Sequence, residues 1–333
     1  MPFRILVGSY TNEIYTVSFD PDAAKLTLES TLTVGHHPSW LTPHPTDPSL
    51  VFTGLEKDGG KAVVVRYDAG GKGTVVGEAP SGGSDPCTLL ALGTELLIGN
   101  YSSGTFAVIP LTYEPPHLQA SETTILQFEG TGPNKERQEA SHPHQIYSHP
   151  TRAELLIPDL GADLARRFKK DASGKRYPLH RARAHQRAQR TPLATRPGGA
   201  LTYRHGLHPA ASRHVVRSSA SMFAAEILLP APNASYPTPY IYVSNREDPS
   251  PGNDTIAIFS TVDSDVGPKM VAEVRSGLKH LRGMVFGGPD DKWLIAGGVY
   301  GGGVKVFERV DGGKGLREVA SLELEAPTGF LWI

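Results

Sequence analysis

Two histidines separated by one proline, His142-Pro143-His144, are the clearest chemical motif in this sequence. Side chains alternate in an extended segment, so the two imidazoles are expected to point the same way. Imidazoles bind metals, but no third ligand of comparable clarity follows. Acid or base catalysis by one histidine needs no metal, so we expect neither a metal nor another cofactor. A histidine pair in an ordinary surface turn is the alternative.

Arginine and glutamate side chains next to strand-like segments suggest that the ligand is an anion. Arg246 ends Ser-Asn-Arg and Arg282 lies within Leu-Arg-Gly, and a guanidinium binds carboxylate or phosphate with two hydrogen bonds. Surface salt bridges are the alternative for both arginines. Glu226 lies within the apolar run Ala-Ala-Glu-Ile-Leu-Leu, where a buried carboxylate either pairs with arginine or titrates near neutrality.

Two further polar motifs are typical of turns. Asn100 precedes Tyr-Ser-Ser-Gly after a strand-like run, and ordinary turn chemistry is the simpler interpretation of that segment. The acids of Asp159-Leu-Gly-Ala-Asp163 bracket a glycine and are more typical of turn formation than of catalysis.

Short strand-like runs bounded by Gly, Pro, Asn and Asp must position these residues, because helical periodicity is almost absent. The runs recur in units of roughly 50–60 residues, which indicates blades of a β-propeller. Units begin near His37, Asp85, His142, Ala225 and His280. The N-terminal strands and residues 329–333 are expected to share a further blade. We therefore predict one all-β propeller domain over residues 1–333.

One basic segment interrupts the repeat. Residues 163–217 hold 14 Lys and Arg against 2 Asp and Glu, although the whole chain has a net charge of −1. We expect residues 176–223 to be disordered or irregular and to disrupt one blade. A frame or splice artefact is our preferred interpretation, because a shifted frame can encode a strand-like peptide. A natural disordered insertion and a polyanion-binding site are the alternatives, and we expect no nucleic-acid partner.

Composition excludes several classes of protein. A single cysteine, Cys87, rules out a disulfide framework and a cysteine-based zinc site. No apolar run approaches the roughly 18–20 residues of a membrane span, so no membrane partner is expected. The apolar stretch near Met1 is too short for a signal peptide, and we expect a cytoplasmic protein.

Nine short motifs occur in a fixed order along the chain. They are Gly8-Ser-Tyr-Thr11, Pro86-Cys87, Gly99-Asn-Tyr-Ser-Ser-Gly104, Gly132-Pro-Asn134 through Arg137-Gln-Glu139, His142-Pro-His144, Pro158-Asp-Leu-Gly-Ala-Asp163, Ala225-Glu-Ile227, Ser244-Asn-Arg246 and Leu281-Arg-Gly283. Together they resemble the seven-bladed β-propeller lactonase family, which includes propeller-type 6-phosphogluconolactonases and fungal 3-carboxy-cis,cis-muconate cyclases. The resemblance covers about residues 1–170 and 224–333.

The resemblance implies a seven-bladed propeller with channel-lining residues at His144 and Arg246. The family's Pro-Arg-His element and a glutamate about 16 residues after it have no match, and both would fall within the anomalous basic segment. We predict that His144 and Glu226 act in catalysis. Arg246, Arg282, His142 and Asn100 are predicted to bind the substrate.

The predicted reaction is hydrolysis of an anionic sugar lactone such as 6-phosphogluconolactone. His144 would deprotonate water, and Arg246 and Arg282 would hold the anion and stabilise developing charge. Reversible lactonisation by a carboxymuconate cyclase is one alternative. A propeller scaffold without enzymatic activity, or an inactive gene product, is the other, since fold does not imply function.

Overall fold

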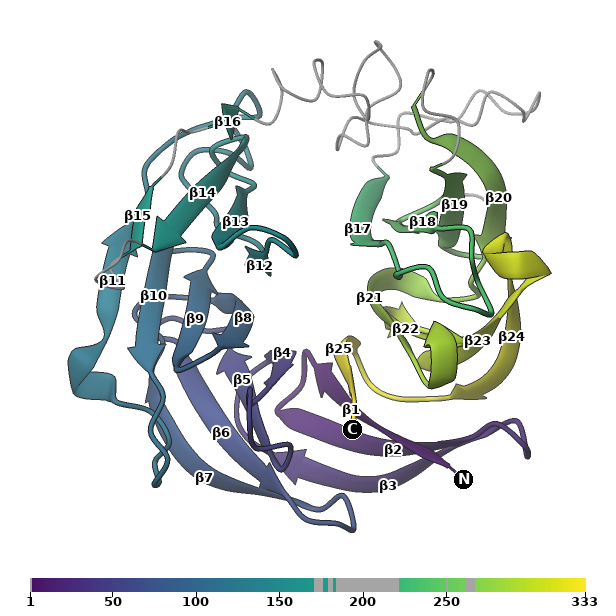
Figure 1. Cartoon of the computed structure of the whole chain (residues 1–333), viewed down its shortest axis with the longest axis horizontal. Coiled ribbons are helices and arrows are strands. Elements are labelled where there is room, and N and C mark those ends of the chain that lie inside the picture. Colours follow the sequence, from purple (N-terminus) through teal and green to yellow (C-terminus); the bar gives the residue numbers. More distant parts are fainter. Residues whose placement is uncertain (1, 171–175, 179–181, 184–221, 250, 262–266) are drawn as a thin grey trace. The chain divides into compact units, whose positions relative to one another are not determined.

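The computed structural model describes residues 2–170, 176–178, 182–183, 222–249, 251–261 and 267–333 (Figure 1). Contacts between Cα atoms divide the chain into two compact units. Unit 1 comprises the described residues of 1–10, 16–29 and 188–333, and unit 2 comprises those of 11–15 and 30–187. No helix among the described residues is long and apolar enough to cross a membrane.

Six antiparallel sheets account for the strands of the described residues, in agreement with the predicted all-β propeller. Their strand orders are β25-β1-β2-β3, β4-β5-β6-β7, β8-β9-β10-β11, β12-β13-β14-β15 with β16 also on β14, β17-β18-β19-β20 and β21-β22-β23-β24. Each of the last five sheets is a meander whose spatial order follows the chain, as expected for propeller blades.

The strands are short, and the only helices among the described residues are single 3₁₀ turns. Their bounds are β1 Phe3–Ser9, β2 Glu13–Asp20, β3 Lys25–Thr33, β4 Pro38–Pro43, β5 Leu50–Leu55, β6 Lys61–Tyr67, β7 Gly73–Pro80, β8 Pro86–Leu92, β9 Glu95–Asn100, β10 Thr105–Pro110, η1 Ala120–Glu122, β11 Thr124–Gln127, β12 Tyr147–Ser148, β13 Glu154–Asp159, β14 Leu164–Lys170, β15 Arg176–Pro178, β16 Ala182–Arg183, β17 Phe223–Leu228, β18 Tyr240–Arg246, β19 Thr255–Ser260, β20 Lys269–Arg275, β21 Lys279–Gly287, η3 Pro289–Asp291, β22 Trp293–Gly301, β23 Val304–Val310, η4 Asp311–Gly313, β24 Gly315–Leu322 and β25 Pro327–Trp332.

Sequence pattern explains which strand takes which place in a sheet. The second strand β5, Leu-Val-Phe-Thr-Gly-Leu, is buried along its whole length, as its continuous apolar run predicts. The fourth strand β20, Lys-Met-Val-Ala-Glu-Val-Arg, alternates between exposed and half-buried residues, as an outer strand does. Apolar continuity therefore identifies the middle strands, and alternation identifies the outer ones.

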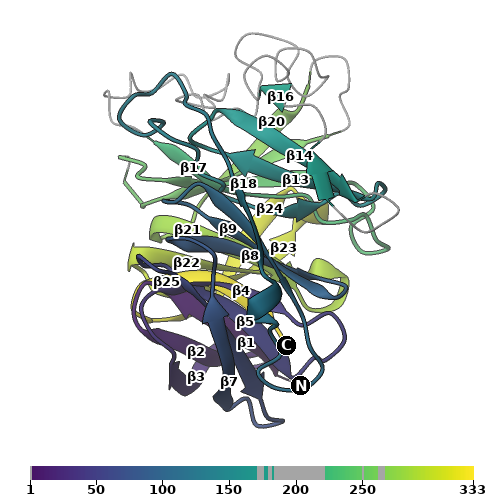
Figure 2. The same cartoon turned by 90° about the vertical axis from the view of Figure 1, so that its left-hand side faces the viewer.

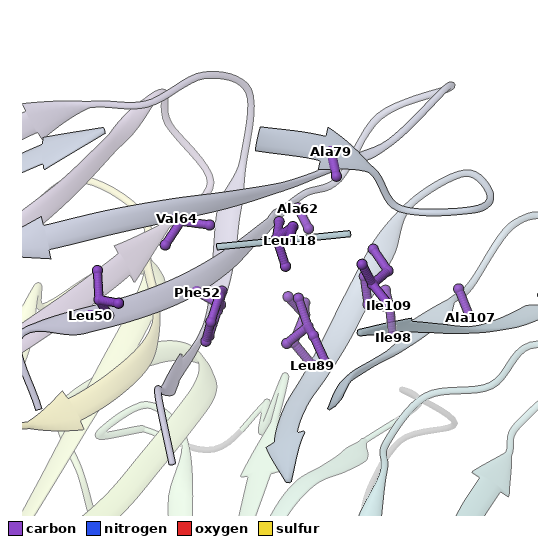
Figure 3. Close-up of a cluster of buried hydrophobic side chains, with 11 residues drawn as sticks. Leu50, Phe52, Ala62, Val64, Ala79, Leu89, Ile98, Ala107, Ile109 and Leu118 are labelled. Atoms are coloured by element: carbon purple, nitrogen blue, oxygen red, sulfur yellow. The ribbon is translucent and has the colours of Figure 1, made fainter. Parts of the chain in front are cut away.

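Apolar side chains between neighbouring sheets form the cores of the two units. In unit 2, side chains of β4–β7 and β8–β11 interlock in one cluster that includes Phe52, Leu89 and Ile98 (Figure 3). In unit 1, a second cluster joins the sheet of β17–β20 to that of β21–β24, with Tyr242 and Phe307 at its centre. Burial of such surface stabilises the fold by about 25 cal/mol per Å².

The two ends of the chain share a sheet, which confirms the prediction. β25 pairs with β1, with Trp332 opposite Ile5 and Phe330 opposite Val7. The chain ends are therefore joined by the same ladder of hydrogen bonds that builds the other sheets.

The basic segment is more ordered at its start than the sequence suggested. Arg176–Pro178 and Ala182–Arg183 form β15 and β16, which both pair with β14, so the expectation of irregular structure is wrong for these residues. Phe223 likewise begins β17. The rest of the expected seventh blade lies outside the described residues, so the number of blades stays a prediction.

Candidate functional site

Glu226 occupies a β-bulge in the first strand of its sheet. Ala224 pairs with Asn245 and Ile227 with Val243, so Ala225 and Glu226 both lie opposite Ser244. The backbone N–H of Glu226 donates to Ser244 Oγ at 2.9 Å, which holds the bulge in place. An extra residue in one strand re-aims a side chain, and bulges are common next to active sites for this reason.

Two guanidinium groups lie within electrostatic range of the Glu226 carboxyl. Burial raises the pKa of Glu226 to about 7, although the positive charges of Arg282 and Arg246 act in the opposite direction. Within the described part of the chain, no basic group comes close enough to form an ion pair with Glu226. A carboxyl that titrates near neutrality beside two cations is suited to accept and return a proton.

Arg282 lies at the matching bulge of the next sheet. Leu281 pairs with Gly298 and Gly283 with Gly297, which leaves Arg282 as the extra residue. Gly283 keeps this strand against β25, because a Cβ there would overlap the carbonyl oxygen of Thr328. The sheets of β17–β20 and β21–β24 are neighbours in unit 1, and β17 contacts β21 (Figures 1 and 2).

The guanidinium of Arg282 stacks on an aromatic ring and keeps its donors available. Its Cζ lies 4.9 Å from the centre of the Tyr10 ring, a cation–π distance. Among the described residues, no acceptor takes a hydrogen bond from the Arg282 guanidinium. A guanidinium has five N–H donors, so Arg282 can bind a ligand anion with two parallel hydrogen bonds.

Arg246 ends β18 and contacts a histidine that the sequence did not single out. Its Nη1 lies 3.4 Å from Nε2 of His280. The other ring nitrogen of His280, Nδ1, lies 3.3 Å from a carboxylate oxygen of Glu247. Burial lowers the pKa of His280, and the charges of Arg246 and Arg282 lower it further. The ring is therefore neutral near pH 7.

The structure thus brings together Glu226, Arg246 and Arg282, three of the six predicted site residues, in unit 1. His280 and Tyr10 complete the group and were missed. A signal for His280 exists: it is the second residue of β21, and Leu281 after it pairs with the second strand of the sheet, as Pro143 after His142 does.

His142 and His144 lie together in unit 2, against one tyrosine. The His142 ring stacks on Tyr101, with centroids 4.3 Å apart and planes 10° apart, and the His144 ring meets the same tyrosine edge-on at 5.8 Å. Nδ1 of His142 lies 2.9 Å from the carbonyl oxygen of Tyr101. The two imidazoles therefore both pack against Tyr101 and lie close together, as the His-Pro-His spacing indicated. Their roles stay predictions.

Asn100 is fully buried and makes contacts that recur elsewhere in the repeat. Its amide donates to the carbonyl oxygen of Ser81 at 3.0 Å and to Thr105 Oγ1 at 3.1 Å. Asn245 takes the corresponding place near the end of β18 in unit 1 and donates to Thr255 Oγ1 at 3.1 Å. This shared contact favours a role in holding the strand ends, and substrate binding by Asn100 stays a prediction.

Asp159 binds the backbone at the start of the histidine pair. Its Oδ1 accepts hydrogen bonds from the backbone N–H groups of His142 and Ala162, and its Oδ2 forms an ion pair with Arg166 at 2.7 Å. Both side chains of this ion pair are buried. Asp159 is thus a structural anchor, consistent with the turn-forming role that the sequence favoured.

Metal ligands are not gathered anywhere in the described residues. No group of three or more His, Cys, Asp or Glu side chains there could hold an ion. Cys87 is buried, and its sulfur lies 3.5 Å from the carbonyl oxygen of Pro143.

Comparison with known proteins identifies the family of this architecture. Residues 4–192 match the model of the family described as "Lactonase, 7-bladed beta-propeller". A relative from Arthroderma benhamiae named "Probable 6-phosphogluconolactonase" is 27% identical over 363 residues, covering 98% of this chain and 88% of that protein. These comparisons support the lactonase prediction over the muconate cyclase alternative.

Solved structures share the fold at lower identity. The periplasmic gluconolactonase of Pseudomonas aeruginosa aligns with a TM-score of 0.70 at 18% identity, over 100% of this chain and 99% of that one. A protein from Lactobacillus plantarum aligns with a TM-score of 0.77 at 18% identity, over 100% of both chains. With its propeller sheets, its ordered motifs and a family match over more than half of its length, the chain belongs to the seven-bladed β-propeller lactonase family.

Proposed function

We propose that this protein hydrolyses an anionic sugar lactone such as 6-phosphogluconolactone. The observation that carries the proposal is the carboxyl of Glu226, whose pKa burial raises to about 7 beside Arg246 and Arg282. Family membership makes a lactone the expected substrate class. The name of the Arthroderma benhamiae relative supports a phosphorylated sugar lactone within that class.

Glu226 acts as the general base. Its carboxylate takes a proton from a water molecule while the water oxygen attacks the lactone carbonyl carbon. The resulting tetrahedral intermediate carries a negative oxygen. When the ring C–O bond breaks, the leaving alkoxide takes the proton back from Glu226, and the open-chain hydroxy acid is released.

The two arginines supply the positive charge that this reaction needs. One guanidinium binds the substrate's anionic group with two hydrogen bonds, and the other stabilises the oxyanion that forms on the carbonyl oxygen. Arg282 suits the second task because its donors are uncommitted among the described residues. His144 is the competing candidate for the general base, as the sequence predicted.

Acid release from 6-phosphogluconolactone by the purified full chain, corrected for spontaneous hydrolysis, tests this proposal. Glu226→Gln keeps the shape of the side chain but cannot accept the proton, and kcat should fall by about 10²–10⁴-fold. The matched control is Glu273→Gln in the same sheet, since Glu273 is exposed and pairs with Arg275 at 3.5 Å. That variant should retain the wild-type rate.

The pH profile of kcat/KM adds a second readout. A general base with a pKa of about 7 predicts a rate that rises with pH and levels off above neutrality. If Glu226→Gln retains wild-type kcat while His144→Ala abolishes it, His144 is the base and the role proposed for Glu226 is wrong. Turnover of carboxymuconolactone with no hydrolysis of the sugar lactone would favour the cyclase alternative.

A further inference from the structure

Three side chains in series connect the rim of the Glu226 site to one of its arginines. Arg246 Nη1 lies 3.4 Å from His280 Nε2, and His280 Nδ1 lies 3.3 Å from Glu247 Oε1. The imidazole thus lies between a cation and a carboxylate, with one ring nitrogen toward each.

The chemistry of the two neighbours fixes the state of the ring. A guanidinium has only donors, so Nε2 of His280 must accept from Arg246 and the proton must reside on Nδ1. A carboxylate has only acceptors, and Glu247 lies on the Nδ1 side. The charges that face the ring are Arg246, Arg282, Glu247 and Asp254. Burial lowers the pKa of His280 most, the two arginines lower it further, and the two carboxylates act in the opposite direction.

The backbone and a second ring hold this imidazole in place. His280 has φ of +57° and Glu247 has φ of +60°, a left-handed conformation that is costly for residues other than glycine. The His280 ring also packs on the ring of Tyr300, with centroids 4.4 Å apart. Strain of this kind persists where the surrounding structure needs one side-chain direction.

We propose that His280 is a positioning residue, which holds the guanidinium of Arg246 in the orientation that binds the anionic group of the substrate. This inference rests on the proposed lactonase function. His280 acts through Arg246 and exchanges no proton with the substrate. Glu247 acts one step further out: its carboxylate charge, 3.3 Å from Nδ1, favours the proton on that nitrogen without a hydrogen bond in the described part of the chain.

Substitution of His280 separates positioning from folding. His280→Gly relieves the backbone strain and removes the acceptor for Arg246, and it should raise KM by about tenfold, the equivalent of one charge-assisted hydrogen bond, with kcat changed less than about threefold. His280→Asn tolerates the left-handed backbone and offers an amide oxygen to Arg246, so it should restore KM to within about threefold of wild type.

A matched control lies at the equivalent place in unit 2. His37 lies directly before β4 and has φ of +52°, close to the +57° of His280. His37→Gly should therefore leave KM unchanged. Equal losses in the two glycine variants, or failure of His280→Asn to restore KM, would show that the effect comes from the backbone and would overturn the proposal.

Nitrogen NMR of the histidine rings tests the contact without any activity. The signal of His280 should be that of a neutral ring protonated on Nδ1, and Glu247→Gln should shift it while His37 is unaffected. A ring protonated on Nε2 would overturn the positioning role whether or not the protein hydrolyses lactones. The expected NMR result without turnover of either lactone would instead place the failure in the proposed function.

Discussion

The same place in the repeat carries different chemistry in the two units. In unit 2, Tyr101 follows a second strand and meets His142, which precedes the first strand of the next sheet. In unit 1, Arg246 is the last residue of a second strand and meets His280, the second residue of the first strand of the next sheet.

The His142 junction of unit 2 and the His280 junction of unit 1 differ in how many of their hydrogen-bonding groups already have partners. Nδ1 of His142 lies against the Tyr101 carbonyl oxygen, its Nε2 is 3.3 Å from Glu139, and its backbone N–H is held by Asp159. In unit 1, the equivalent junction leads to Arg282, which offers its donors beside Glu226. The two junctions therefore share one backbone arrangement, and a few different residues separate the packed junction of unit 2 from the anion site proposed in unit 1.

The largest expected difference concerns the two carboxylates that hold the start of a first strand. Asp159 binds the N–H of His142 and also neutralises the buried Arg166. Among the residues that the structure describes, the Asp254 carboxylate accepts from the N–H groups of Leu281 and Asp248 and forms no ion pair. Asp159→Asn should lower the free energy of unfolding by about 3–5 kcal/mol, because Arg166 stays buried without its counter-charge.

Asp254→Asn is the matched variant and should lower the free energy of unfolding by about 2 kcal/mol. It weakens two hydrogen bonds to a charged acceptor but leaves no buried cation without its counter-charge. Urea unfolding of both variants measures the contrast. Equal losses would mean that the ion pair with Arg166 contributes nothing beyond the backbone hydrogen bonds.

A smaller difference is expected between the paired asparagines. Asn100 is fully buried, and Asn100→Ala removes the amide that donates to the Ser81 carbonyl and to Thr105 Oγ1. The free energy of unfolding should fall by about 2 kcal/mol. Within the described ranges, the Asn245 side chain makes one hydrogen bond, to Thr255, and it is half-buried, so Asn245→Ala should cost about 1 kcal/mol. Both changes should leave the KM for the lactone unchanged. A raised KM for Asn100→Ala alone would instead support its predicted role in substrate binding.

The sequence revealed the blades better than the site. Strands such as Leu50–Leu55 are apolar runs between turn residues, and local pattern is enough to find them. The grouping of Glu226 with Arg246 and Arg282 depends on bulges in two strands, and a bulge leaves no periodic trace in the sequence. His280 was missed because its importance arises from a contact across sheets and from a left-handed backbone. The sequence does hold one signal, since His280 and His142 occupy corresponding positions in their repeats.

The last comparison concerns whether ionisation of Glu226 lowers the stability of the folded protein. The pKa of Glu226 is raised in the folded protein, so between its ordinary value of 4.5 and about 7 the folded state holds a proton that the unfolded state has lost. Stability from this group is therefore present below pH 4.5 and is lost as the pH rises through 7.

Glu226→Gln removes that loss, because a neutral amide does not ionise. The shift from 4.5 to about 7 corresponds to at most about 3 kcal/mol, so the variant should melt up to about 5 °C above wild type at pH 8 and closer to wild type at pH 5. Glu273→Gln on the surface should show no such trend, because its carboxyl stays in contact with solvent and Arg275. An unchanged melting temperature at pH 8 would mean that the arginines fully compensate the buried charge. The junction of unit 1 would then be as well satisfied as that of unit 2, and the contrast between them would lie in geometry alone.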